Sequence, residues 1–339
     1  MEQKPATIKE IAKRLNVSVS TVSRALHNHP SIGLRTKMQV QKVAQELNYE
    51  PNQAAISFKQ GKSLTIGVIL PNLGEEFFSI AINGIEDKAT ANNYTVLIGQ
   101  SRDDLEREKQ IVDTMRRHRV DGLLVSLSKH TEAYDHFEQL KQYNIPVVFF
   151  DRVPQTDEVY SVSCDLKKSS VELVDWLVAK GHTKIAFING PDTMQPSKDR
   201  LEGFLASLKK NKITVNKDYI QQTDLSKAST KEAMKKLFAL TIRPTAIVAF
   251  NDYVALDAIK CTRAEGLQVN EDIFFVSYAN LPITSYLDHP PIASVEQFPY
   301  QQAEKAMSIL LQLINSKGED LVINKRFVLE SKVIIHPGD

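Results

Sequence analysis

The chain has 339 residues, more than one ordinary hydrophobic core accommodates, so its length predicts two or three domains. Its composition, with 42% hydrophobic and 24% charged residues, is typical of a folded globular protein and excludes general disorder. Because the chain has no apolar run of ~18 residues, no secretion signal and two distant cysteines, we expect a cytoplasmic protein with reduced thiols, no metal site and no membrane partner.

The formal net charge of +1 conceals an uneven distribution along the chain. Residues 1–62 contain ten Lys and Arg against four Asp and Glu, whereas the remaining residues contain 32 against 37. A short basic head on a mildly acidic body indicates that the head binds a polyanion. A basic face that is merely solvated is the alternative.

Two helices are plainly marked in the head. Residues 7–15, TIKEIAKRL, begin with Thr7 and Glu10 at the capping-box spacing and continue with apolar residues at helical intervals. Residues 40–47 carry a second apolar stripe at i, i+3, i+4 and i+7. The segment between these two helices therefore decides the fold of the head.

That segment, NVSVSTVSRAL at 16–26, alternates apolar and polar residues before it takes up helical spacing. A four-residue strand between two helices would have no partner for its backbone groups. Ser18, in contrast, is a suitable N-cap for a helix. Asn16 tolerates the left-handed conformation that a tight turn between helices requires. The segment therefore predicts a turn and a second helix.

The outer face of this second helix is rich in short hydroxyl side chains. It carries Val19, Ser20, Thr21, Ser23 and Arg24. Short hydroxyls let a helix lie deep in a major groove and bond phosphates, and an arginine fork pairs with guanine O6 and N7. The pattern favours a DNA-binding helix-turn-helix, with a plain three-helix bundle as the alternative.

The stretches TIKEIAKRLNVSVSTVSRALHNHPSIG and VAQELNYEPNQAA resemble the headpiece of the lactose/galactose-repressor (LacI/GalR) family of bacterial transcription regulators. The resemblance continues along nearly the whole chain. Many members have glycine where this chain has Asn16. The resemblance implies base-reading positions at Val19, Ser20 and Arg24, and DNA-backbone positions at Thr7, Ser18, Thr21, Ser23 and His29.

Residues 51–63 join the head to the body and read as a linker with a short helix that begins at Pro51. The resemblance implies that this segment folds as a hinge helix on operator DNA and inserts a side chain into the minor groove. Phe58 stands at the wedge position, where leucine is usual, and an apolar wedge suits that role. The implied minor-groove positions are Asn52, Ala55, Phe58 and Lys59.

From Leu64 onward, short apolar runs alternate with helical stretches, a pattern typical of parallel, doubly wound sheets. The series restarts near residue 160, which predicts two similar lobes. The first series has strands LTIGVIL, YTVLIG, VDGLLVS and PVVFFD, with helices at 74–93, 103–119 and 131–145; the second has YSVSC, KIAFIN, PTAIVAF and IFFVSY.

The predicted fold is therefore α/β, with an all-α helix-turn-helix headpiece and a two-lobed, doubly wound parallel-sheet effector domain like that of periplasmic binding proteins. The resemblance assigns the last part of the chain to return crossings between the lobes. The predicted domains are 1–50, 51–63 and 64–339, with lobe 1 at about 64–160 and 292–318 and lobe 2 at about 161–291 and 319–339.

Ligands of such sheets lie beyond the carboxyl ends of the strands, which for two facing lobes means the cleft. Aromatic rings with Asp, Asn and Arg suit a polyol or a small anion. Each residue alone is equally compatible with a helix cap, an ion pair or the core. Ala279 stands where sugar-binding members often carry aspartate. The candidate effector residues are Phe77, Phe78, Ser126, Asp151, Arg152, Arg200, Asn251, Asp252 and Asn280.

Two other functions compete with DNA-binding regulation. An enzyme is disfavoured because GxGxxG, Walker and GxSxG motifs are missing and no catalytic spacing stands out. A solute-binding protein of a transport system would have the same two-lobed body but would need no basic head. We therefore predict a non-enzymatic, homodimeric repressor that uses no cofactor, binds a double-stranded DNA operator and responds to a small-molecule effector, a sugar or sugar derivative; an activator is the alternative.

Overall fold

The computed structural model describes residues 6–50, 61–316 and 324–336, and its contacts divide the chain into two compact units, Met1–Ser63 and Leu64–Asp339. We call these units the head and the body. The body thus begins where the sequence analysis places the start of the effector domain. The predicted hinge residues Asn52, Ala55, Phe58 and Lys59 lie outside the described residues.

The head is a three-helix unit built on a helix-turn-helix. Asn16 ends the first helix with a left-handed φ of 51°, and Ser18 caps the second by accepting a hydrogen bond from the Thr21 N–H at 3.1 Å. Ile11 and Val22 are fully buried between the helices. The helical interpretation of residues 16–26 is confirmed. The helices are α1 (Ile8–Leu15), α2 (Val19–Leu26) and α3 (Leu34–Glu46).

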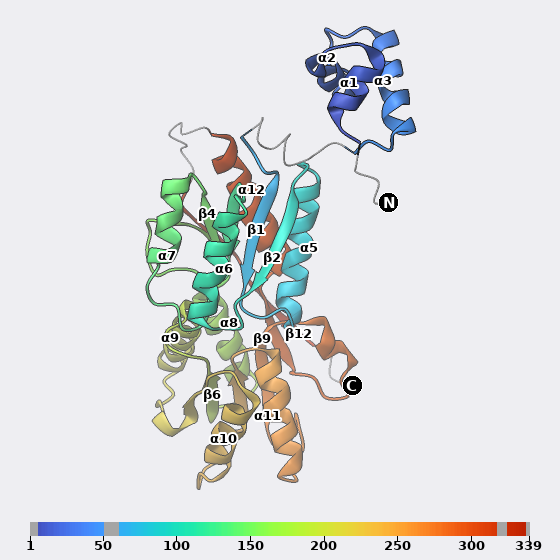
Figure 1. The fold of residues 1–339 in the computed structure, drawn as a ribbon. Helices are drawn as coiled ribbons and strands as arrows, with labels where there is room; N and C mark the ends of the chain where they lie inside the picture. The colour runs from blue at the N-terminus through green and yellow to red at the C-terminus, as the bar shows by residue number, and fades with distance from the viewer. Residues whose placement is uncertain (1–5, 51–60, 317–323, 337–339) are drawn as a thin grey trace. The chain divides into compact units, whose positions relative to one another are not determined.

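The body contains two six-stranded sheets, and Figure 1 shows helices around each of them. All strand pairings among the described residues are parallel except that of β12 with β10, which is antiparallel at the edge of the second sheet. The first sheet has the order β11-β5-β4-β3-β1-β2 and the second the order β12-β10-β9-β8-β6-β7.

The strands of the first sheet are β1 (Thr65–Leu70), β2 (Thr95–Gln100), β3 (Gly122–Val125), β4 (Val147–Phe150), β5 (Tyr160–Cys164) and β11 (Arg326–Leu329). Those of the second are β6 (Ile185–Asn189), β7 (Ile220–Gln222), β8 (Ala246–Ala249), β9 (Phe274–Ala279), β10 (Ala293–Glu296) and β12 (Lys332–Ile335).

Helices cover both faces of each sheet, as the doubly wound fold requires. Lobe 1 carries α5 (Glu76–Thr90), α6 (Leu105–Arg117), the short α7 (Asp135–Glu138) and α12 (Pro299–Asn315), and lobe 2 carries α8 (Leu166–Ala179), α9 (Gln195–Lys210), α10 (Lys227–Phe238) and α11 (Asp252–Ala264). Three 3-10 turns lie at Gln139–Tyr143, Lys217–Tyr219 and Pro282–Tyr286. The helix predicted at 131–145 is thus reduced to α7 and the first of these turns.

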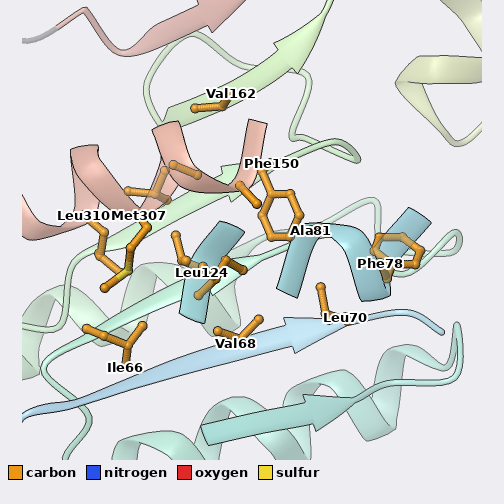
Figure 2. Close-up of a cluster of buried hydrophobic side chains, with 14 of the residues drawn as sticks. Ile66, Val68, Leu70, Phe78, Ala81, Leu124, Phe150, Val162, Met307 and Leu310 are labelled. Atoms are coloured by element: carbon orange, nitrogen blue, oxygen red, sulfur yellow. The ribbon is translucent and has the colours of Figure 1, made fainter. Parts of the chain in front are cut away.

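The core of lobe 1 lies between its sheet and the helices α5 and α12. Figure 2 shows Ile66, Val68 and Leu70 from alternate positions of β1 facing Met307 and Leu310 of α12, and all five side chains are fully buried. The opposite face of the sheet packs against α6 and α7. This two-sided burial explains why the strands are almost continuously apolar in the sequence.

The observed lobes differ from the predicted boundaries at three strands. We expected residues from 161 onward in lobe 2, but β5 pairs with β4 in the first sheet. Residues 292–318 were expected in lobe 1, yet β10 pairs with β9 in the second sheet, and β11, expected in lobe 2, pairs with β5 in the first. Backbone hydrogen-bond partners decide which sheet holds a strand, and hydrophobic periodicity does not reveal those partners.

The chain passes between the lobes three times, after β5, after β10 and between β11 and β12. These crossings are hydrogen-bonded to one another: the Cys164 thiol donates to the carbonyl of Gln297 at 2.9 Å, and the Ser331 hydroxyl donates to the carbonyl of Asp165 at 2.8 Å. Phe298, next to Gln297, has a left-handed φ of 53°. The crossings therefore form one bonded hinge beneath the cleft.

Candidate DNA-reading surface and effector cleft

The outer face of α2 is the candidate DNA-reading surface. Val19 is 41% exposed, and Ser20 and Arg24 are also exposed, while Val22 and Ala25 on the same helix are fully buried. Helical periodicity therefore separates the three predicted base-reading side chains from the core of the head. Arg24 forms no ion pair with any of the described residues, so its guanidinium fork is available for base edges.

The predicted DNA-backbone positions also lie at the surface of the head. Thr7, Ser18 and His29 are exposed, and Thr21 and Ser23 are half-buried. The Ser18 hydroxyl lies 2.7 Å from that of Ser20 and 2.8 Å from that of Thr21, so these hydroxyls form one polar cluster at the start of α2. A helix N-terminus with outward hydroxyls is suited to phosphate oxygens.

The candidate effector cleft lies between the lobes, where the carboxyl ends of strands from both sheets meet. Its lining residues surround about 430 Å³ of space that is open to solvent on one side. Lobe 1 contributes residues after β1 and β4, and lobe 2 contributes residues after β6, β8 and β9. Six of the nine predicted effector residues line it: Phe77, Phe78, Asp151, Arg152, Arg200 and Asn251.

Arg200, from α9, is the most unusual polar group in the cleft. It is only 3% exposed, and its Nη2 donates to Oε1 of Gln297 at 3.1 Å. Its Nε and Nη1 have no hydrogen-bond partner among the described residues. The guanidinium lies 4.0 Å from the ring centroid of Phe250 and 4.6 Å from that of Tyr278, and burial lowers its pKa to about 10. An unpaired buried donor is costly, so a ligand acceptor would stabilise it.

Asp151 faces the same cavity from the end of β4. Burial raises the pKa of its carboxyl to about 6, against the opposing effect of the Arg152 and Arg200 charges. The Ser126 hydroxyl donates to Asp151 Oδ2 at 3.3 Å and fixes the carboxyl. Asp151 has a left-handed φ of 59°, which turns the chain at the strand end. The carboxylate is thus held as an acceptor for ligand hydroxyls.

Arg152, although it lines the cleft, is already paired. Its Nη1 lies 2.6 Å from Asp103 Oδ1 and its Nη2 3.9 Å from Glu75 Oε1. The side chain is 6% exposed and lies over the ring of Phe78. A buried guanidinium neutralised by two carboxylates holds lobe 1 together at the cleft wall, which leaves Arg200 as the arginine with free donors.

The other three predicted effector residues, Ser126, Asp252 and Asn280, do not line the cavity. Ser126 is fully buried and is used by Asp151. Asp252 is fully buried, and its carboxylate accepts from the Leu281 N–H and from two serine hydroxyls. Asn280 donates to Glu296 Oε2 and lies 2.9 Å from His336 Nε2. Each of these side chains forms a hydrogen bond with a neighbouring group, so each helps to hold the wall of the cleft in place.

Sequence reasoning missed eight lining residues. Phe250 and Ala279 end strands β8 and β9, so the strand-end rule could have found them. Gln297 lies in a crossing whose place only the tertiary structure reveals. The eight are Glu75, Met194, Pro196, Phe250, Tyr253, Ala279, Leu281 and Gln297.

Within residues 6–50, 61–316 and 324–336, no group of three or more His, Cys, Asp or Glu could hold a metal ion. None of the helices in those ranges is long and apolar enough to cross a membrane.

A helix-turn-helix head and a two-lobed body with a cleft between its lobes together define a ligand-controlled DNA-binding regulator. Comparisons with known proteins agree with this class. Residues 7–52 match the model of the bacterial regulatory proteins of the lacI family, and residues 66–320 match the periplasmic binding protein domain. The chain belongs to the lacI family of bacterial regulatory proteins.

Individual relatives match almost the whole chain. The HTH-type transcriptional repressor CytR of Escherichia coli (strain K12) is 32% identical over 310 residues, which cover 91% of this chain and 90% of CytR. The repressor PurR of Aliivibrio salmonicida is 31% identical over 316 residues, covering 93% and 94%. The Lac repressor dimer, solved with operator and an anti-inducer, superposes with a TM-score of 0.84 at 26% identity and 98% coverage of each chain.

These findings confirm the predicted fold class and family, and the prediction of a ligand-responsive transcriptional repressor that is not an enzyme. The rival interpretation as a transport receptor fails because the head matches a regulatory family over its own length.

Proposed function

We propose that two copies of the chain bind a palindromic DNA operator through α2 of each head, and that a small polyhydroxylated ligand in the cleft switches this binding. The observation that carries the proposal is Arg200, a buried guanidinium with two donor nitrogens unpaired among the described residues. Such a group favours whatever ligand supplies oxygen acceptors to it. In this proposal Val19, Ser20 and Arg24 read base edges.

The proposed dimer follows from the small size of one head. A single α2 offers few side chains to base edges, and paired heads read half-sites about one helical turn apart. The solved Lac repressor is a dimer bound to operator, which supports the same arrangement here. Selection of binding sites from random DNA by the full chain is expected to return a palindrome, and a strictly asymmetric, monomer-sized site would contradict the dimer.

The chemistry of the cleft favours an uncharged polyol over an anion. Arg152 is neutralised by Asp103 and Glu75, so one arginine, Arg200, remains to bind ligand oxygens. Asp151 lies on the same cavity and would repel a phosphate when it is ionised. Phe77, Phe78 and Phe250 supply flat apolar walls of the kind that pack on sugar rings.

A thermal-shift screen of the full chain tests this proposal. The panel contains monosaccharides, disaccharides, nucleosides and sugar phosphates, each at millimolar concentration. We expect an uncharged monosaccharide or its derivative to raise the Tm of the body, and the shift to vanish in Arg200→Ala while it persists in Arg24→Ala. Stabilisation by sugar phosphates alone, or an equal shift in Arg200→Ala, would contradict the proposed ligand chemistry.

A further inference from the structure

Tyr253 links the two lobes across one rim of the cleft. It is the second residue of α11 in lobe 2, yet its ring lines the cavity and packs against the core of lobe 1. Its hydroxyl accepts a hydrogen bond from the Glu76 N–H at 3.2 Å and lies 3.5 Å from the carbonyl of Gly74, which accepts from it. A lobe 2 side chain is therefore bonded to the backbone of lobe 1.

Glu76 makes the reciprocal contact from lobe 1. Its Oε2 accepts a hydrogen bond from the Ile283 N–H at 3.2 Å, and Ile283 belongs to the 3-10 turn Pro282–Tyr286 of lobe 2. Glu76 thus donates through its N–H to one element of lobe 2, α11, and accepts through its carboxylate from another, the 3-10 turn. We call Tyr253, Glu76 and Ile283 the rim cluster.

Neither α5 nor the 3-10 turn Pro282–Tyr286 is capped by a side chain of its own lobe in the described structure. The N-cap of α5 is Glu75, whose side chain makes no capping hydrogen bond in the described structure. The residue before the 3-10 turn, Leu281, has no side-chain acceptor. The first N–H groups of a helix need acceptors from outside it, and here each lobe provides one for the other. If the lobes separated, the N–H groups of Glu76 and Ile283 would lose these acceptors and would hydrogen-bond with water.

A second set of hydrogen bonds also joins the lobes. Lys129 of lobe 1 donates from Nζ to the carbonyl of Asp224, and its own carbonyl accepts from the Thr193 hydroxyl at 2.5 Å. The unpaired donors of Arg200 therefore lie between lobes that are hydrogen-bonded to each other at two places. Because Arg200 is only 3% exposed, a ligand reaches its donors when the lobes move apart and such bonds break.

We propose that the rim cluster is a gate that controls access to the effector cleft. The Tyr253 hydroxyl holds this gate closed through its hydrogen bonds to lobe 1. The proposal rests on the proposed function only in taking the cleft as the ligand site. Loss of the hydroxyl is expected to loosen both reciprocal contacts together, because they share Glu76. The Ile283 N–H then loses protection although its own acceptor is intact.

Hydrogen-exchange mass spectrometry with residue-level fragmentation tests the gate on the full chain without any ligand. In Tyr253→Phe we expect exchange at the Glu76 and Ile283 amides to rise about two- to tenfold, the range that loss of one such hydrogen bond produces. The matched control is Tyr219→Phe, which removes a tyrosine hydroxyl bonded to the carbonyl of Ile242 at 3.0 Å within lobe 2. It should leave both rim amides unchanged.

Any of the following results would contradict the proposed gate. Unchanged exchange at both amides means that the hydroxyl does not fasten the rim. Faster exchange at Glu76 alone means that the two contacts are independent. Faster exchange throughout lobe 2, or equal effects of Tyr219→Phe, means general destabilisation. Because no ligand is used, these failures are distinguishable from a failed ligand screen, which would contradict the proposed effector chemistry instead.

Discussion

The head and the body use arginine in opposite ways. Arg24 is exposed on one helix and keeps its hydration until DNA arrives, whereas Arg200 is 3% exposed and keeps two nitrogens unpaired in a cleft built from both lobes. A solvated fork gains its specificity from the geometry of base edges. A buried guanidinium gains its specificity from the free-energy cost of leaving its N–H donors without acceptors. In the proposed function, DNA reading is local to one helix, and effector recognition involves both lobes of the body.

The largest expected effect follows from the buried arginine. Arg200→Ala removes charged donors from a desolvated site and should weaken effector binding by about 2–5 kcal/mol. Arg200→Lys should recover little, because an ammonium cannot present the same planar fork. Isothermal titration with the effector found in the ligand screen measures both variants. Affinity within threefold of wild type in Arg200→Ala would show that the ligand does not use this side chain.

Removal of the exposed Arg24 should cost less binding free energy than removal of the buried Arg200. Arg24→Ala is expected to cost about 1–3 kcal/mol on the operator and to relax specificity at one base pair per half-site. Arg14→Ala is the matched control, since Arg14 pairs with Glu46 at 2.9 Å on another face of the head. Competition binding on operator variants measures the preference. Undiminished discrimination in Arg24→Ala would mean that another residue reads the base.

These two sites also differ in how far the sequence could predict them. Capping residues and helical spacing lie within a few positions of one another, so Ser18, Asn16 and the exposed face of α2 were predictable from one short stretch. The strand-end rule predicted Asp151 and Arg200 in the cleft because Asp151 directly follows β4 and Arg200 lies in α9, the helix that follows β6. Such information is local.

What the sequence did not predict depends on distant partners. The sheet membership of β5, β10 and β11 follows from backbone pairing between segments far apart in the chain. Gln297 reaches Arg200 only because a crossing between lobes passes beneath α9. Asp252 was predicted to contact the effector because it follows a strand. A carboxylate in that position can also accept a hydrogen bond from a neighbouring loop, and here it accepts from the Leu281 N–H.

The charge of the cleft should appear in stability as a function of pH. The pKa of Asp151 is raised from 3.8 to about 6 by burial, so the folded state holds more protons than the unfolded state between pH 4 and 6. Stability therefore falls as pH rises through this window, and the cost is fully present above pH 6. Asp151→Asn should raise the stability of the body by up to about 3 kcal/mol at pH 8. It should give no gain at pH 4.

Differential scanning calorimetry at the two pH values checks this prediction, with Asp113→Asn as the control. Asp113 forms ion pairs with Arg116 and Arg117 on the surface of α6, and its pKa is lowered, chiefly by the hydrogen bond from Arg116. The control should not stabilise the body at pH 8. A gain for Asp151→Asn that is equal at pH 4 and pH 8 would show that its charge is not the cause.

The smallest expected effect concerns the start of the reading helix. Ser18→Ala removes the acceptor of the Thr21 N–H and should destabilise the head by about 1 kcal/mol. Ser18→Asp keeps a capping oxygen and should retain the stability of the head. Far-ultraviolet circular dichroism of the full chain, followed through the transition of the head, measures both variants. Equal stability of all three proteins would mean that the cap contributes nothing.

The central claim is that operator reading and effector recognition lie on separate surfaces of one chain. Arg24→Ala and Arg200→Ala, each assayed for operator affinity by fluorescence anisotropy and for effector binding by thermal shift, test it most directly. We expect Arg24→Ala to lose operator affinity and keep the ligand shift, and Arg200→Ala to keep ligand-free operator affinity and lose the shift. Loss of both activities in either variant would contradict the claim.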